Sequence, residues 1–236
     1  MGALALGGLS ACRSDAGTAA FVGNTRFTDA QVTKAALGVK TPGVSSSDVK
    51  HDYVLNLVYI EVLRKYAAAT GVTLTEPTAD YLSQLATQFD APTTDPFVVA
   101  QARTRAYAES LAAKATPATP TDAELQPMFQ RAVAAQLADP TAFDTFKSTI
   151  MGVPGFTNFV GLQKELVKSE TNDNISINPR YAAPCTASPC SGFQFDMLPL
   201  GNGQGQQFSS VILPLGPDST PAVLDQSQAP APAAGN

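Results

Sequence analysis

Residues 51–71 read HDYVLNLVYIEVLRKYAAATG, and this stretch decides the fold class. Its apolar residues would lie almost all round an α-helix, which leaves no clear polar face. A helix of that kind is normally buried against several partners. Gly71 marks its end, because glycine tolerates the positive φ that is common at a helix C-terminus. The stretch therefore predicts a long central helix inside a mainly helical core.

Start signals for further helices lie on both sides of this stretch. A short helix that reaches Leu37 is expected to begin at Thr28 or Asp29, and Ser47-Asp48 is expected to cap the long helix. Together with the loops between them, these segments predict a multi-helix body. Downstream of the long helix we expect five more helices, over residues 77–89, 96–115, 121–137, 141–150 and 157–169.

Short extended segments precede and follow the helices. In residues 18–27 an apolar run, the pair Gly23-Asn24 and a second short run predict two brief strands around a tight turn. Residues 175–181, ISINPRY, and residues 192–195, GFQF, are also expected to be extended. Strands so far apart in sequence can pair only if the chain returns to its start. We therefore predict a mainly α fold with a small β patch, formed by the N-terminal hairpin and C-terminal strand segments.

The end of the chain differs in composition from the rest. Beyond Leu198 it is rich in Gly, Gln and Pro, and it finishes QAPAPAAGN. Such a segment buries too little apolar area to offset the entropy lost on ordering. We therefore predict a folded core over residues 12–198 and a disordered tail over residues 199–236.

Charge and hydropathy exclude two classes of partner contact. The formal net charge of -5 argues against nucleic acid, whose phosphates require clustered Lys and Arg. No stretch approaches the roughly 18 unbroken apolar residues of a transmembrane helix. Attachment to a membrane would therefore have to come from a covalently bound lipid.

Cys12 is the candidate for that lipid. It ends the tetrapeptide Leu9-Ser10-Ala11-Cys12 directly behind the short apolar run of residues 3–9, and this order is typical of a bacterial lipobox. Residues 1–11 would then be a signal peptide with a truncated basic region, which a start codon placed too far downstream would explain. The alternative is that Cys12 is a small buried hydrophobic residue in an N-terminal strand.

Cys185 and Cys190 complete the cysteine count of three. Two cysteines close together in sequence, with a third at a lipobox, are the pattern expected of an exported lipoprotein with one disulfide. A zinc site is disfavoured, because only His51 could join the two thiols and four ligands are usual. We therefore predict a structural disulfide between Cys185 and Cys190, and no metal site.

Catalytic residues are not indicated by the sequence. His51 is the only histidine, and with Asp52 it is interpreted as a solvated helix terminus, because neighbours on a helix point to different sides. Arg180 could bind a peptide carboxylate, but a structural hydrogen bond at the closing strand is favoured. We expect no enzyme activity and no cofactor.

Four segments carry a family resemblance when they are taken in order. They are TAAFVGNTRFTDAQV (18–32), VLNLVYIEVLRKYAAATGVTLTEPTADYL (54–82), TPTDAELQPMF (119–129) and INPRY (177–181). They resemble the opening hairpin, the long core helix, the helix start before the isomerase domain and the closing strand of the SurA/PrsA group of extracytoplasmic foldases. The resemblance implies a SurA N-terminal-domain-like chaperone core.

One part of that family is missing. The interval from Met128 to Ile175 contains no histidine and is too short for the parvulin-type isomerase domain. The resemblance therefore implies a lipid-anchored, chaperone-like protein at the extracytoplasmic face of the bacterial cell membrane. It would bind unfolded or newly exported polypeptides without isomerase activity. The alternatives are an envelope docking lipoprotein with one protein partner and a divergent peptidyl-prolyl isomerase.

We predict that cell-derived protein begins at Cys12, with a diacylglyceryl thioether on its sulfur and an acylated amine. Several acyl chains would anchor the protein stably, because each buried CH₂ contributes about 0.8 kcal/mol and one chain alone binds only marginally. Mass spectrometry of protein expressed with a full signal peptide measures this, and Cys12→Ser is the control. An intact, unlipidated Met1 terminus would contradict the prediction.

Overall fold

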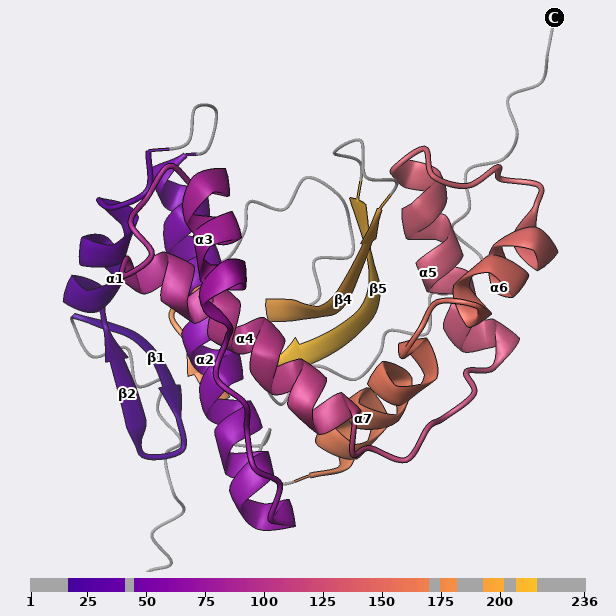
Figure 1. Cartoon of the computed structure of the whole chain (residues 1–236), viewed down its shortest axis with the longest axis horizontal. Helices are drawn as coiled ribbons and strands as arrows, with labels where there is room; N and C mark the ends of the chain where they lie inside the picture. Colours follow the sequence, from indigo (N-terminus) through magenta and orange to yellow (C-terminus); the bar gives the residue numbers. More distant parts are fainter. Residues whose placement is uncertain (1–16, 41–44, 170–174, 182–192, 202–206, 216–236) are drawn as a thin grey trace, which may run out of the picture.

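The computed structural model describes residues 17–40, 45–169, 175–181, 193–201 and 207–215 (Figure 1). Helices dominate these residues, and the predicted mainly helical fold with a small sheet is confirmed. The helices are α1 (Asp29–Ala36), α2 (Ser46–Thr70), α3 (Ala79–Gln88), α4 (Pro96–Ala112), α5 (Asp122–Ala134), α6 (Phe143–Met151) and α7 (Phe156–Lys168). The strands are β1 (Thr18–Val22), β2 (Thr25–Thr28), β3 (Ile175–Ile177), β4 (Phe193–Gly201) and β5 (Gln207–Leu215), with a 3-10 turn, η2, over Pro179–Tyr181.

The central helix α2 is buried on several sides, as its sequence predicts. It contacts α1, α4, β1, β2, β4 and η2. Its start lies two residues before the predicted one, because the Ser45 hydroxyl accepts a hydrogen bond from the Asp48 amide and the Asp48 carboxylate accepts one from the Ser45 amide. Gly71 ends it with a φ of 72°, as expected.

The N-terminal strand lies between two antiparallel partners. The first sheet has the order β2-β1-β3, so Phe21 faces Arg26 on one side and Ser176 on the other. Gly23 adopts a φ of 59° in the turn between β1 and β2, where a left-handed conformation favours glycine. The predicted return of the chain to its start is therefore confirmed.

A cluster of polar contacts holds the returning segment in place. The Tyr181 hydroxyl donates to the Asp29 carboxylate over 2.7 Å, and the Arg180 guanidinium pairs with the same carboxylate. Arg180 also donates to the Thr18 carbonyl over 3.3 Å. The Asn178 amide N–H donates to the Ala19 carbonyl over 2.9 Å. These bonds join η2 to β1 and to the first turn of α1, which agrees with the structural interpretation of Arg180.

The second half of the chain packs around a two-stranded hairpin. In Figure 1 the hairpin of β4 and β5 lies between the helices α2 and α4 on one side and α5 on the other. β4 contacts α2 and α7, while β5 contacts α5 and α7. The hairpin therefore joins the N-terminal helices to the C-terminal ones, and its buried side chains belong to the same hydrophobic core as α2.

The expectation of a disordered tail from residue 199 is wrong for the end of β4 and for all of β5. Val211 and Leu213 on β5 are both 0% exposed, so they are core residues, like Met197 and Leu198 on the part of β4 that lies inside the predicted core. The Gly- and Gln-rich stretch that suggested disorder separates two apolar strands, and averaging composition over the whole tail conceals the second of them. The folded core therefore extends past residue 198 to Leu215, and residues 216–236 lie outside the described ones.

The described residues include seven α-helices. None of them combines the length and the hydropathy that crossing a bilayer requires.

We predict that Leu213→Ala lowers the free energy of unfolding by about 2–4 kcal/mol, because it removes buried methyl groups and leaves a cavity. Leu213 is 0% exposed, whereas Leu37 is 76% exposed, so Leu37→Ala is the matched control and should change little. Denaturant unfolding of the full chain measures both. Equal stability of Leu213→Ala and the unchanged protein would mean that β5 is not part of the core.

Candidate functional site

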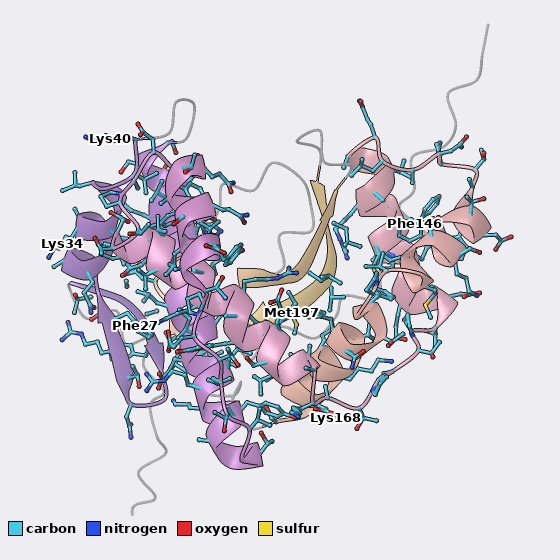
Figure 2. The ribbon with its side chains drawn as sticks, in the orientation of Figure 1. Phe27, Lys34, Lys40, Phe146, Lys168 and Met197 are labelled. Carbon is cyan, nitrogen blue, oxygen red and sulfur yellow. The ribbon has the colours of Figure 1, made fainter. Side chains whose placement is uncertain are left out.

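A groove of about 550 Å³ lies where β2, α2, α4 and the connection between α2 and α3 meet. Its apolar lining is partly open to solvent: Phe27, Leu57, Ile60 and Val99 are each half-buried. Phe27 is labelled in Figure 2, beside these helices. The remaining lining residues are Thr25, Tyr53, Glu61, Arg64, Glu76, Pro96, Ala100, Arg103 and Tyr107.

Local periodicity explains why these side chains converge. Along α2 the lining residues recur at 53, 57, 60, 61 and 64, and along α4 they recur at 96, 99, 100, 103 and 107. Spacings of three and four place side chains on one face of a helix. Thr25 and Phe27 are two apart on β2, so they lie on one face of the strand. Two helix faces and one strand face thus build a groove with an apolar floor.

Glu76 organises the polar end of the groove. Its Oε1 accepts a hydrogen bond from the Tyr107 hydroxyl over 2.6 Å, and its Oε2 accepts one from Arg103 Nε over 2.9 Å. The bond from Tyr107 is the main reason that the pKa of Glu76 is lowered from its ordinary value, and the bond from Arg103 adds to it. Burial, and then the bond to Glu76, raises the pKa of Tyr107. Glu76 is therefore charged and Tyr107 neutral at neutral pH.

Glu61 organises the other charged contacts and joins the hairpin to α2. Its Oε1 accepts a hydrogen bond from the Thr25 hydroxyl over 2.8 Å. Arg64 Nη1 lies 3.7 Å from its Oε2, and Lys65 Nζ lies 4.0 Å from its Oε1. Lys65 also donates to the Val22 carbonyl over 2.6 Å. These contacts position β2 against α2 and so set the width of the groove.

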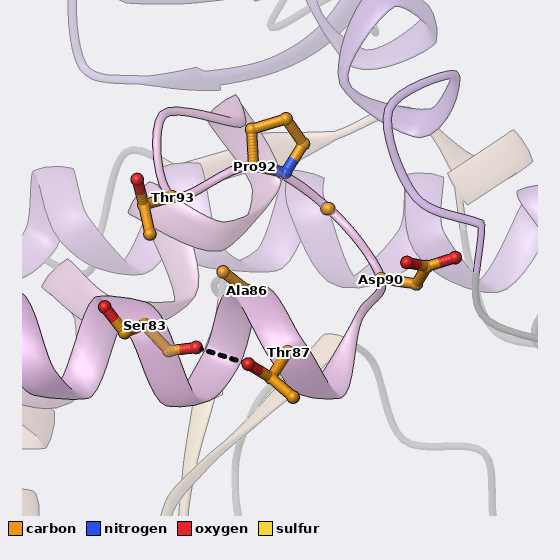
Figure 3. A pocket seen from close by; sticks show the side chains of 7 residues that line it. Ser83, Ala86, Thr87, Asp90, Pro92 and Thr93 are labelled. Carbon is orange, nitrogen blue, oxygen red and sulfur yellow. Dashed lines mark hydrogen bonds between the residues drawn. The ribbon is translucent and has the colours of Figure 1, made fainter.

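A second, shallower hollow lies at the end of α3, and it is a weaker candidate (Figure 3). It measures about 660 Å³, but short side chains line it: Ser83, Ala86, Thr87, Asp90, Ala91, Pro92 and Thr93. The Thr87 hydroxyl donates to the Ser83 carbonyl one turn earlier in the same helix. Neither an aromatic nor a large aliphatic side chain lines this hollow, so it offers little apolar area to a ligand.

The candidate residues from the sequence lie elsewhere. Cys12, Cys185 and Cys190 fall outside the described residues. His51 is half-buried rather than solvated, because its Nδ1 lies 2.5 Å from the Tyr181 carbonyl and must carry the proton that this bond needs. Arg180 lies in the cluster around Asp29. Neither His51 nor Arg180 lines the groove.

Sequence reasoning missed the groove because its parts come from four separate elements. The spacing of Leu57, Ile60 and Arg64 is visible in the sequence, but α2 is apolar nearly all round, so no single stripe stands out. The bond between Glu76 and Arg103 joins residues that are far apart in sequence. A pattern search within any one segment cannot find it.

Comparison of the chain with protein-family models, with curated proteins and with solved structures finds no significant match. The chemistry available to the groove is therefore inferred from its own residues. Among the described residues, no three His, Cys, Asp or Glu side chains gather as a metal-ion site. Apolar area, two guanidinium groups, two carboxylates and two phenols suit non-covalent binding of a chain segment.

We predict that a titration of Glu76 by NMR gives a pKa below 4.5, and that Tyr107→Phe moves it toward that value. The folded-state pKa lies below the unfolded one, so the contact stabilises the fold above about pH 4.5 and is lost as the pH falls through the folded-state value. Tyr66→Phe is the control, because the Tyr66 hydroxyl donates to Glu165 instead. An unchanged pKa in Tyr107→Phe would contradict the assigned cause.

Proposed function

We propose that the protein is a chaperone-like lipoprotein that holds unfolded or newly exported polypeptide by non-covalent contact. It would be attached through Cys12 to the extracytoplasmic face of a bacterial cell membrane, with Cys185 and Cys190 joined in a disulfide. The resemblance to the SurA/PrsA foldases motivates this role. The groove between β2, α2 and α4 is the observation that carries it.

The groove supports polypeptide holding through its exposed apolar area. Phe27, Leu57, Ile60 and Val99 keep part of their surface in water, and covering that surface with an apolar segment is favourable. A captured chain loses conformational entropy, and the groove offers few fixed polar anchors. Binding should therefore be weak and broad, which suits a protein that captures and releases many sequences.

The helices of the second half support a role without proline isomerisation. The described residues between Met128 and Ile175 include the end of α5, all of α6, all of α7 and the short connections between them. The interval contains no histidine, unlike the isomerase site of the family that the sequence resembles. At the position in the sequence where the foldases carry their isomerase domain, this chain therefore has helices that pack into its own core.

We predict that the protein suppresses aggregation of a denatured client and leaves the cis–trans relaxation of an Xaa-Pro peptide unchanged. Leu57→Gln should weaken client binding by about fivefold, because polar atoms replace apolar contact worth about 1 kcal/mol. Leu37→Gln makes the same change at an exposed site away from the groove and should bind like the unchanged protein. Light scattering and peptide titration measure these effects.

Three outcomes would contradict the proposal. Clear acceleration of the proline step would indicate an isomerase. No effect on aggregation, together with one co-purifying envelope protein, would indicate a docking lipoprotein with a single partner. Equal binding by Leu57→Gln and Leu37→Gln, with thermal unfolding showing both variants folded, would place the binding surface elsewhere.

A further inference from the structure

The groove contains more hydrogen-bond donors than its own acceptors use. Its two carboxylates already have partners. Glu76 accepts one bond at each oxygen, from Tyr107 and Arg103. Glu61 accepts from Thr25 at Oε1, which Lys65 also approaches, while Arg64 approaches its Oε2. A cationic ligand would therefore have to displace existing contacts from these oxygens.

The two guanidinium groups have donors to spare. An arginine carries five N–H donors, and Arg103 uses only Nε in its bond to Glu76. Arg64 Nη1 lies 3.7 Å from Glu61 Oε2, which is longer than a hydrogen bond. The side chains are 63% exposed for Arg64 and 45% exposed for Arg103, so a ligand can reach both.

Both arginines belong to one site. Each lines the groove, and each acts electrostatically on Glu76 and Tyr107. Along α4, Arg103 lies between Ala100 and Tyr107, so groove-lining carbon surface is present on both sides of it. A guanidinium in such a place suits a carboxylate in the middle of a segment, because apolar neighbours of that carboxylate can contact the groove in both directions.

We propose that the groove prefers extended polypeptide segments in which an Asp or Glu side chain lies among apolar residues. Arg64 and Arg103 bind the carboxylate, while Phe27, Leu57, Ile60 and Val99 contact its apolar neighbours. The inference rests on the proposed function and adds a substrate class to it. The lining holds two guanidinium groups and two carboxylates, so its charges balance, whereas the whole chain has a formal net charge of -5. The preference for a carboxylate therefore comes from the unused guanidinium donors and not from a net positive charge.

The test uses short fluorescent peptides with blocked ends and alternating leucine and serine around a central Glu, Gln or Lys. We expect the Glu peptide to bind about three to five times more tightly than the Gln peptide, as is usual for partly exposed ion pairs. The Lys peptide should bind most weakly. Raising the salt concentration to about 1 M should remove most of the difference, because it shortens the screening length.

Arginine variants locate the effect. Arg103→Gln and Arg64→Gln should each reduce the ratio of the affinity for the Glu peptide to the affinity for the Gln peptide. Arg105→Gln is the matched control, because Arg105 lies on the same helix and pairs with Glu109, but does not line the groove. It should keep the full preference. Circular dichroism and thermal unfolding establish that each variant is folded.

The outcomes separate this inference from the proposed function. Equal binding of the Glu and Gln peptides, or tighter binding of the Lys peptide, would overturn the inference while the proposed function stands. A Gln peptide with a free C-terminal carboxylate that binds as tightly as the blocked Glu peptide would also overturn it, in favour of chain ends. Failure of all the peptides to bind would instead overturn the proposed function.

Discussion

The burial of α2 is the constraint on which the rest of the structure depends. Val54, Val58, Tyr59, Val62 and Leu63 are all 0% exposed, although they point in different directions around the helix. With 25 residues at about 1.5 Å each, the helix is roughly 38 Å long, so no single neighbour can cover it. The surface of α2 is instead buried by several elements from different parts of the chain: α1, α4, the first sheet and β4.

Because the apolar surface of α2 has to be buried, segments distant in sequence return to the N-terminal half and pack against this helix. The segment with β3 and η2 pairs with β1 and contacts Asp29 and α2, and the hairpin of β4 and β5 connects α2 with α5 and α7. The Tyr66 hydroxyl on α2 also donates to Glu165 on α7 over 2.7 Å. Burial, and then that bond, raises the pKa of Tyr66 to about 12, so Tyr66 remains a donor throughout the physiological pH range. One core thus includes residues from nearly the whole described chain.

The groove lies along a part of α2 whose apolar side chains are only partly buried by neighbouring elements. The hairpin turn brings β2 against one side of α2, and α4 crosses the other, which leaves the stripe with Leu57, Ile60 and Arg64 half open. Charged residues at the margins are arranged so that Glu61 and Glu76 are occupied internally. Affinity would then come from apolar contact, which is broad, and selectivity from the unused guanidinium donors, which favour a carboxylate. The two contributions are physically separate, so they can be altered independently.

Local signals in the sequence were sufficient for the helices, the N-terminal hairpin and the stop at Gly71, because caps, turns and periodicity act over a few residues. They also predicted that the extended residues 175–181 return to the N-terminal hairpin; residues 175–177 do so as β3, whereas Pro179–Tyr181 form a 3-10 turn. Only tertiary structure revealed that β5 belongs to the core, because the hairpin that β5 forms with β4 packs on α5 and α7, and these helices lie far from β5 in sequence. The same is true of the groove. Glu76, Arg103 and Thr25 acquire their roles from neighbours that the packing of α2 brings together, and side-chain contacts of that range leave no periodic trace in the chain.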